Sequence, residues 1–202
     1  MRTLWLASGS PRRAELLEQV GVSFVRLPAP GIDERARAQE SPQDYVCRMA
    51  AEKARAGWQV LSGGDQHQAV VLGADTSVVI DGEILGKPAS DAQAVQMLTR
   101  LSGAEHQVIS AVSLVWAAQQ ETRMSITRVR FRDLSDQEIQ RYVATGEGRD
   151  KAGSYGIQGL GGLLVDRING SYSGVVGLPL ELLPELFELA RVTCWRSPDL
   201  SP

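Results

Sequence analysis

Strand-like and helix-like segments alternate along the whole chain, and this alternation limits the fold more than any other feature. Runs rich in β-branched and other apolar residues, typical of strands, occupy residues 3–7, 22–27, 70–80, 106–117 and 121–132. Helix-like segments begin at Pro11 and Pro42 and occupy residues 91–101, 135–145 and 178–191. No internal repeat and no linker long enough to split the chain separates them. We therefore predict one domain over residues 1–202, an α/β fold with a mixed twisted sheet flanked by helices, whose strand order the sequence leaves open.

The segments between these elements are expected to be irregular. Residues 28–41 are predicted to form a loop, residues 61–68 a polar linker, and Asp81-Gly82 a hairpin turn. Residues 150–177 are rich in glycine and predict turns and short strands, and the last residues are expected to fray. Serines stand at the predicted N-caps of helices at residues 10, 41 and 135.

Composition excludes several classes of protein. The net charge of −3 and the aromatic fraction of 5% argue against a nucleic-acid-binding module. No apolar run approaches the roughly 20 residues of a membrane helix, and the N-terminus does not resemble a signal peptide. The two cysteines, Cys47 and Cys194, form neither a disulfide framework nor a metal-binding pattern. We therefore expect a cytoplasmic protein without a nucleic-acid or membrane partner.

The segment that follows the first strand has the features of a phosphate site. Ser8, Gly9 and Ser10 offer small side chains and free backbone N–H groups at the start of a helix, where the helix dipole favours an anion. Arg12 and Arg13 add two guanidinium groups, which match phosphate oxygens in bidentate fashion. The alternative is a capped helix with two solvated arginines.

An acid interrupts the apolar stretch of residues 70–80. Asp75, followed by Thr76, is a carboxylate on an otherwise buried strand, which is costly unless the group is used. Ligands gather at strand ends in α/β sheets, so Asp75 is a candidate for holding a divalent metal or for acting as general base toward water. The alternative is an Asx turn.

The lysines of this chain are few. Only three of its 21 basic residues are lysines, so a lysine can mark a place where a compact ammonium group is needed. Two of them, Lys53 and Lys87, lie in a helix and in a Gly-Lys-Pro turn, and the loop before that helix carries Glu34. Gln158, in the glycine-rich segment, can face a nucleobase edge with one donor and one acceptor. Taken singly, each of these residues is equally compatible with a surface or structural role.

Together, the segments resemble the Maf family of nucleoside triphosphate pyrophosphatases, and the resemblance covers nearly the whole chain. It is carried in order by LASGSPRRAELL, IDE, AAEKA, GADTSVVI, GKP, LSGAEHQVISAVSL, DKAGSYGIQGLGGLLV and INGSYSGVVGLPL. The AGxYGIQG pattern is similar to that of the branch acting on dTTP and UTP rather than the branch acting on 7-methyl-GTP.

The resemblance implies a fold and a reaction. The family's fold is related to that of inosine triphosphate pyrophosphatases, with two lobes around a central cleft. Its reaction is hydrolysis of a nucleoside triphosphate to the monophosphate and pyrophosphate with Mg²⁺ or Mn²⁺, by a protein that is often a homodimer.

The resemblance also assigns roles to residues. The catalytic acid falls on Asp75. The substrate-specificity positions fall on Arg12, Thr76 and Gln158. The phosphate and metal positions include Glu34, which we group with Asp75 as a metal ligand. The phosphate-binding set that we expect, with Ser8 added from the N-terminal segment, is Ser8, Arg13, Lys53 and Lys87.

Some alternatives stay open. The sequence does not separate a general-base role of Asp75 from a metal-ligand role. It also leaves open an enzyme that acts on modified pyrimidine nucleotides, and a nucleotide-binding regulator of septum formation that replaces or accompanies hydrolysis. A histidine-based triad is not expected, because His67 lies in a polar linker and His106 starts a strand.

Overall fold

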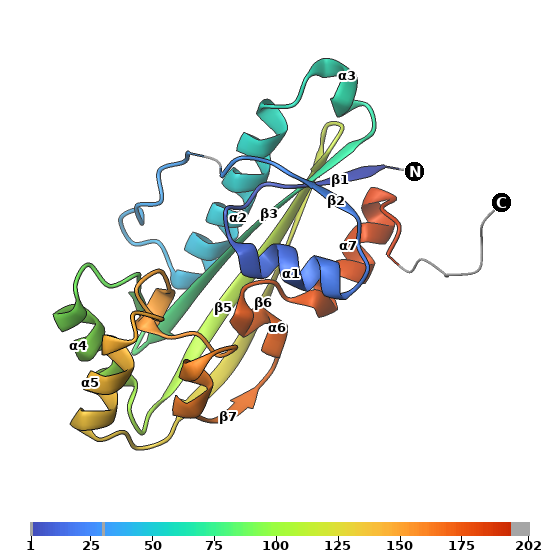
Figure 1. Cartoon of the computed structure of the whole chain (residues 1–202). Helices are drawn as coiled ribbons and strands as arrows, with labels where there is room; N and C mark the ends of the chain where they lie inside the picture. Colours follow the sequence, from blue (N-terminus) through green and yellow to red (C-terminus); the bar gives the residue numbers. More distant parts are fainter. Residues whose placement is uncertain (1, 30, 195–202) are drawn as a thin grey trace.

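A mixed sheet of seven strands forms the centre of the computed structural model, which describes residues 2–29 and 31–194 (Figure 1). The strand order is β2-β1-β3-β5-β6-β7, with β4 paired to β3. β1 runs parallel to β2 and β3, and the other neighbours are antiparallel. The strands are β1 (Thr3–Leu6), β2 (Phe24–Arg26), β3 (Ala69–Ile80), β4 (Glu83–Leu85), β5 (Glu105–Trp116), β6 (Gln119–Phe131) and β7 (Val165–Asn169). The predicted mixed α/β architecture is confirmed.

Helices cover both faces of this sheet. On one face, Val46 and Ala50 of α2 pack against Ile109 and Ala111 of β5. On the other face, α1, α6 and α7 share one apolar cluster with β1, β3 and β5. The helices are α1 (Pro11–Gln19), α2 (Pro42–Gln59), α3 (Gly63–Gln66), α4 (Asp91–Leu101), α5 (Asp136–Ala144), α6 (Tyr172–Val176) and α7 (Leu183–Ala190). Three 3₁₀ turns are η1 (Ala152–Ser154), η2 (Leu160–Leu164) and η3 (Leu180–Leu182).

Two apolar cores lie toward opposite ends of the long strands. The first joins Leu72 of β3 to Leu17 of α1 and Phe187 of α7. The second joins Val78, farther along β3, to α4 and α5. Figure 1 shows α4 and α5 at one end of β3 and β5, well apart from α1 and α7. This arrangement agrees with the expected two lobes.

The buried environment of β3 explains its sequence. Every residue from Ala69 to Ile80 is buried except Thr76, which is half-buried. A strand covered on both faces is typically a continuous apolar run. The three consecutive polar residues Asp75, Thr76 and Ser77 therefore mark the part of the strand that meets something other than apolar packing.

The predicted helix starts are mostly confirmed. The Ser41 hydroxyl accepts a hydrogen bond from the backbone N–H of Asp44, and Ser135 forms a capping box with Glu138. Ser10 stands at the N-cap of α1, but its side chain makes no capping hydrogen bond there. That position leaves the first turn of α1 without a side-chain cap.

Three details differ from expectation. The polar linker 61–68 contains the helix α3, in which the Ser62 hydroxyl caps the N–H of Asp65. The Asp81-Gly82 turn leads into β4, a strand too short to give a sequence signal. The glycine-rich stretch 150–177 contains the helix α6 in addition to turns and a strand. Residues 195–202, where fraying is expected, lie outside the described residues.

None of the helices in the described part of the chain has the length and apolarity needed to cross a membrane.

Candidate active site

A gap in strand pairing opens one edge of β3. On this edge, β1 pairs with residues 69–72 and β4 pairs with residues 78–80, so the stretch from Gly73 to Ser77 has no strand partner there. Its other edge stays paired with β5, where Asp75 lies opposite Ala111. Asp75 therefore lies in the middle of β3, not at the strand end that the sequence suggested. The strand end next to the site is that of β1, which stops beside Leu72.

Asp75 and Thr76 serve opposite faces of the sheet, because successive side chains of a strand point in opposite directions. Asp75 points toward α2, where Lys53 donates a hydrogen bond to it. Thr76 contacts the other layer, with its hydroxyl 2.8 Å from that of Ser110 and 3.5 Å from Arg13 Nη2. The unpaired edge between them gives both side chains access to one space.

Arg13, on the first turn of α1, is fixed by three acceptors. Its guanidinium donates to the Gly177 carbonyl at 2.8 Å, to Ser8 Oγ at 3.1 Å and to Thr76 Oγ1 at 3.5 Å. Burial lowers the pKa of Arg13, and the nearby carboxylate of Asp75 opposes that shift. The N-terminal segment thus delivers a rigid cation. Thr76, which the resemblance places among the specificity residues, contacts Arg13 rather than Arg12 or Gln158 among the described residues.

A glycine brings α2 close to β3. A Cβ atom on Gly73 would lie 2.4 Å from the backbone nitrogen of Ala54, so no larger residue fits between this helix and this strand. The close approach lets Lys53 Nζ reach Asp75 Oδ1 at 2.7 Å. The same ammonium lies 2.8 Å from Glu34 Oε1. Lys53 therefore joins the two carboxylates that were predicted as metal ligands.

The two carboxylates differ in their titration. Burial raises the pKa of Asp75, and the attraction of Lys53 and Arg13 only partly opposes this shift. Burial also acts to raise the pKa of Glu34, but there the hydrogen bond and charge of Lys53 outweigh it, so the pKa is lowered. Asp75 is therefore the better proton acceptor of the two.

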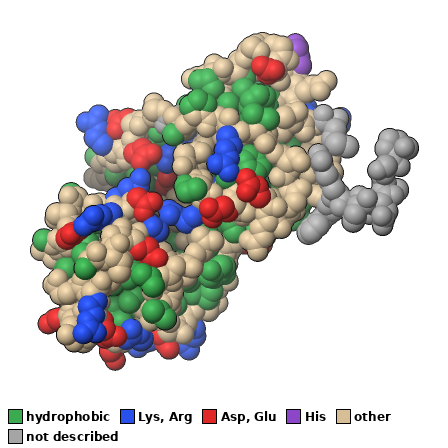
Figure 2. Space-filling model, in the orientation of Figure 1, with side chains coloured by type: hydrophobic (Ala, Val, Ile, Leu, Met, Phe, Trp, Pro, Cys, Tyr) green, Lys and Arg blue, Asp and Glu red, His purple; other side chains and the backbone are tan. Residues whose placement is uncertain are grey.

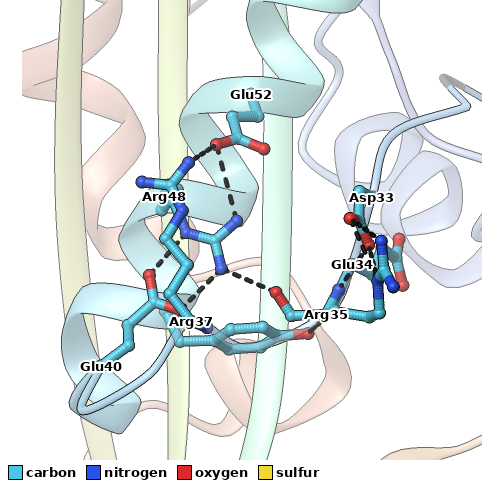
Figure 3. A network of polar contacts seen from close by, with 8 residues as sticks. Asp33, Glu34, Arg35, Arg37, Glu40, Arg48 and Glu52 are labelled. Carbon is cyan, nitrogen blue, oxygen red and sulfur yellow. Dashed lines mark hydrogen bonds and ion pairs between the residues drawn. The ribbon is translucent and has the colours of Figure 1, made fainter.

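The loop that carries Glu34 is fastened to α2 (Figure 3). Tyr45 donates a hydrogen bond to the Glu34 carbonyl at 2.9 Å. Arg48 donates to the Arg35 carbonyl at 3.1 Å and forms a bidentate pair with Glu40 at 2.5 and 2.6 Å. The Arg48 and Glu40 side chains are 13% and 8% exposed, unlike the other ion pairs of this loop. This half-buried pair holds a segment whose described residues have no regular secondary structure.

Two loops meet on the opposite side of the space. The backbone N–H of Gly153 donates to the Gly86 carbonyl at 3.1 Å and thereby joins the Gly-Lys-Pro turn to the glycine-rich segment. Gly153 has a φ of +67°, and a Cβ atom there would lie 2.9 Å from Val78. Lys87 forms no ion pair within the described residues, and its side chain is exposed. Its charge is therefore available to an anionic ligand.

Arg12 lines the same space. Its side chain is 27% exposed, and its guanidinium lies 3.5 Å from the carboxylate of Asp150, which also pairs with Lys151 at 2.7 Å. Gln158, farther along this segment, is exposed. Both side chains remain free to contact a ligand that reaches this side of the cavity.

The structure brings all of the predicted site residues to one cavity of about 800 Å³. In the view of Figure 2, basic and acidic side chains gather across the middle of the molecule. The predicted residues that line the cavity are Ser8, Arg12, Arg13, Glu34, Lys53, Asp75, Thr76, Lys87 and Gln158.

Sequence reasoning missed other residues around this cavity. Tyr45, Glu147 and Asp150 line it, and Ser110 lies behind Thr76. Glu147 stands between two glycines, a pattern that indicates a tight turn but not what the carboxylate binds. Ser110 is one of several polar residues in an apolar strand, and only its pairing opposite Thr76 shows its place. No local pattern distinguishes these residues from ordinary surface or core positions.

Comparison with known proteins agrees with this picture. The chain is 57% identical over 193 residues to a protein of Alcanivorax borkumensis named dTTP/UTP pyrophosphatase, a match that covers 96% of this chain and 98% of that protein. Proteins of the same name from Salmonella typhimurium and Escherichia coli O157:H7 are 56% and 53% identical, and these matches cover 89% of each chain.

Two solved structures show a weaker likeness. They are a nucleoside-triphosphatase or dITP/XTP pyrophosphatase from Mycobacterium abscessus and a HAM1 protein from Coxiella burnetii, with TM-scores of 0.39 and 0.45 and identities of 20% and 16%. The matches cover 64% and 65% of this chain and 72% and 73% of those chains. A model of the Maf-like protein family matches residues 3–190. With relatives at this identity and a family match over nearly its full length, the chain belongs to the Maf-like protein family.

Proposed function

We propose that this protein hydrolyses dTTP and UTP to the monophosphate and pyrophosphate. The observation that carries the proposal is the single cavity, in which the cations Arg13, Lys53 and Lys87 and the carboxylates Glu34 and Asp75 face the same space. Its volume of about 800 Å³ is in the range of small-molecule sites. The names of the close relatives support the choice of substrate.

The basic residues suit the phosphate end of the nucleotide. A triphosphate is strongly anionic, and cleavage between its α- and β-phosphates builds further charge on the departing pyrophosphate. Arg13 is held rigidly, so it needs little reorganisation as that charge develops, and Lys87, which has no ion-pair partner within the described residues, is available to the phosphates. Such cations bind the transition state more strongly than the ground state, which accelerates the reaction.

Asp75 suits the activation of water. It is the buried carboxylate of the cavity, and its raised pKa makes it a stronger base than an ordinary aspartate. Lys53 holds the carboxylate oriented through the 2.7 Å hydrogen bond. In the proposed reaction, Asp75 orients the attacking water and accepts its proton.

The carboxylates of Glu34 and Asp75 also suit a divalent metal ion. No group of three or more His, Cys, Asp or Glu side chains that suits an ion occurs in residues 2–29 and 31–194. Mg²⁺ is often held by one or two carboxylates together with substrate phosphates, which is the donor set that Glu34 and Asp75 offer. A bound Mg²⁺ or Mn²⁺ would neutralise phosphate charge and favour attack at phosphorus.

The specificity end lies on the glycine-rich side of the cavity. Uracil and thymine present an acceptor–donor–acceptor edge, which the amide of Gln158 can meet with one donor and one acceptor. Arg12 can add a donor to a carbonyl oxygen. Cytosine presents a different pattern, and each unpaired buried donor or acceptor costs roughly 1–3 kcal/mol.

The proposal also includes the cellular location of the enzyme, its oligomeric state and its further substrates. Both cysteines are free, as expected for a protein of the reducing cytoplasm. A homodimer and action on modified pyrimidine nucleotides stay predictions.

A nucleotide panel tests the proposal. Pyrophosphate release from dTTP, UTP, dCTP and 7-methyl-GTP is measured for the purified protein with Mg²⁺ and with Mn²⁺. We expect dTTP and UTP to be the best substrates, and omission of the metal to abolish turnover. Faster release from 7-methyl-GTP would show that the assignment of the base is wrong.

A further inference from the structure

A carboxylate outside the predicted site holds the segment that bears Gln158. Glu147 lies just after α5, half-buried, and lines the same cavity. Its two oxygens accept the backbone N–H groups of Leu160 and Gly161, both at 2.8 Å. The segment of residues 156–161 is therefore fixed at its C-terminal end by a side chain.

A tyrosine fixes the other end. Tyr142 is a buried residue in the last turn of α5. Its hydroxyl donates a hydrogen bond to Glu147 Oε2 at 2.7 Å and accepts one from the backbone N–H of Gly156 at 3.3 Å. Tyr142 is 6% exposed. One connected pair of side chains thus holds both ends of the short segment 156–161.

The glycines of this segment make the contact close. A Cβ atom on Gly159 would lie 1.9 Å from Glu147 Oε1, and one on Gly161 would lie 2.9 Å from the Tyr142 hydroxyl. Larger residues would force the segment away from the pair. The glycines therefore allow the backbone of residues 156–161 to lie close to Glu147 and Tyr142.

The contacts favour a charged Glu147. Burial acts to raise the pKa of Glu147, but the hydrogen bonds from Tyr142 and the two backbone amides outweigh it, and the pKa is lowered. Hydrogen bonds to an ionised acceptor are stronger than those between neutral groups. Gln158 itself makes no side-chain hydrogen bond among the described residues, so its placement depends on the backbone that carries it.

We propose that Glu147 and Tyr142 are positioning residues for nucleobase recognition, which set the position of Gln158 by holding residues 156–161. The inference rests on the proposed function, because it assumes that Gln158 meets the base. The base takes no part in the bond that breaks, and we expect its contacts with Gln158 to act mainly on substrate binding.

Two substitutions test the inference in the full-length protein. Glu147→Gln leaves at least one backbone N–H facing an amide group instead of an acceptor, and Tyr142→Phe removes the hydroxyl from both contacts. We expect each to raise KM for dTTP and UTP by about tenfold with kcat nearly unchanged. Discrimination between dTTP and dCTP should fall by a similar factor.

A double-mutant cycle separates positioning from general stability. If Glu147 acts through Gln158, Glu147→Gln should reduce discrimination no further in a Gln158→Ala background. The matched control is Glu138→Gln, at the start of α5, where the carboxylate completes the capping box. That variant should lower Tm slightly and leave discrimination unchanged.

Binding of non-cleavable α,β-methylene analogues of dTTP and dCTP gives a second readout that does not require turnover. If the wild type binds these analogues selectively but cleaves neither nucleotide, the proposed function is wrong and the positioning role is still measured. If the wild type discriminates and both Glu147→Gln and Tyr142→Phe keep that discrimination, the positioning role is overturned. Additive effects in the cycle would overturn it as well.

Discussion

Two adjacent arginines of this site lie in different surroundings. Arg13 is held by the Gly177 carbonyl and two hydroxyl groups, deep in the cavity beside Thr76. Arg12, whose side chain is 27% exposed, pairs with Asp150 of the glycine-rich segment. Neighbours in a helix point in directions about 100° apart, so one short segment can reach both ends of a nucleotide.

We predict that substituting the two arginines changes different kinetic parameters. Arg13→Gln should lower kcat for every nucleotide by about 10²–10³, because a preorganised cation for the phosphates is lost. Arg12→Gln should instead reduce discrimination between dTTP and dCTP by about tenfold. Steady-state kinetics with both nucleotides measures these effects. Identical kinetic profiles for the two variants would contradict this division.

At the scale of elements, the loop of residues 28–41 depends on α2 for its position. Its described residues, 28–29 and 31–41, form no regular secondary structure, yet the loop must hold Glu34 near Lys53. The half-buried Arg48–Glu40 pair and the hydrogen bond from Tyr45 supply that support (Figure 3). The outer pair, Arg37 with Glu52, is more exposed and contributes less.

We predict that loosening this loop impairs catalysis from a distance. Arg48→Gln should lower kcat/KM by about ten- to a hundredfold, because Glu34 moves away from Lys53 and Asp75. Arg37→Gln, on the same loop but 68% exposed, is the matched control and should have little effect. Rates near wild type for Arg48→Gln would show that the loop keeps its position without this pair.

The sequence predicts most elements of this fold, because their signals are local. Ser41 and Ser135 mark helix starts, and the long strands β5 and β6 follow from their apolar and β-branched residues. The helix α3 and the strand β4 are too short to give a periodic pattern. Local signals also cannot show that Glu147 binds two backbone N–H groups that lie 13 and 14 residues away.

At the scale of the whole molecule, long-range pairing creates the site. The cavity exists because β1 stops beside Leu72 and β4 ends beside Val78, which leaves part of β3 unpaired on one edge. Strand order depends on contacts between residues far apart in sequence, so composition and periodicity do not reveal it. The resemblance of motifs predicted a set of site residues, and the topology explains why these residues line one cavity.

The stability of the fold should depend on one buried histidine. His106 is 2% exposed, and its Nε2 lies 2.8 Å from the Tyr155 hydroxyl. The Phe131 and Tyr155 rings pack edge-on against it. Burial lowers the pKa of His106 to about 4, so the fold keeps the ring neutral where the unfolded chain would protonate it.

We predict that unfolding free energy falls with acidification through this residue. Since the pKa of His106 in the fold lies below the unfolded value of about 6.5, its contribution is complete above that pH and is lost as the pH falls toward 4. The loss amounts to roughly 3 kcal/mol. Urea titrations should show a shallower pH dependence for His106→Gln than for wild type. His67→Gln, at the exposed histidine, should keep the wild-type dependence.

The reaction itself provides the most direct test of the account. Phosphorus NMR of dTTP incubated with the protein and Mg²⁺ identifies the bond that is cleaved, and the same experiment with Asp75→Asn tests the base. We predict dTMP and pyrophosphate as products, and a rate for Asp75→Asn that is lower by about 10²–10⁴. Formation of dTDP and orthophosphate, or an undiminished rate in Asp75→Asn, would contradict the account.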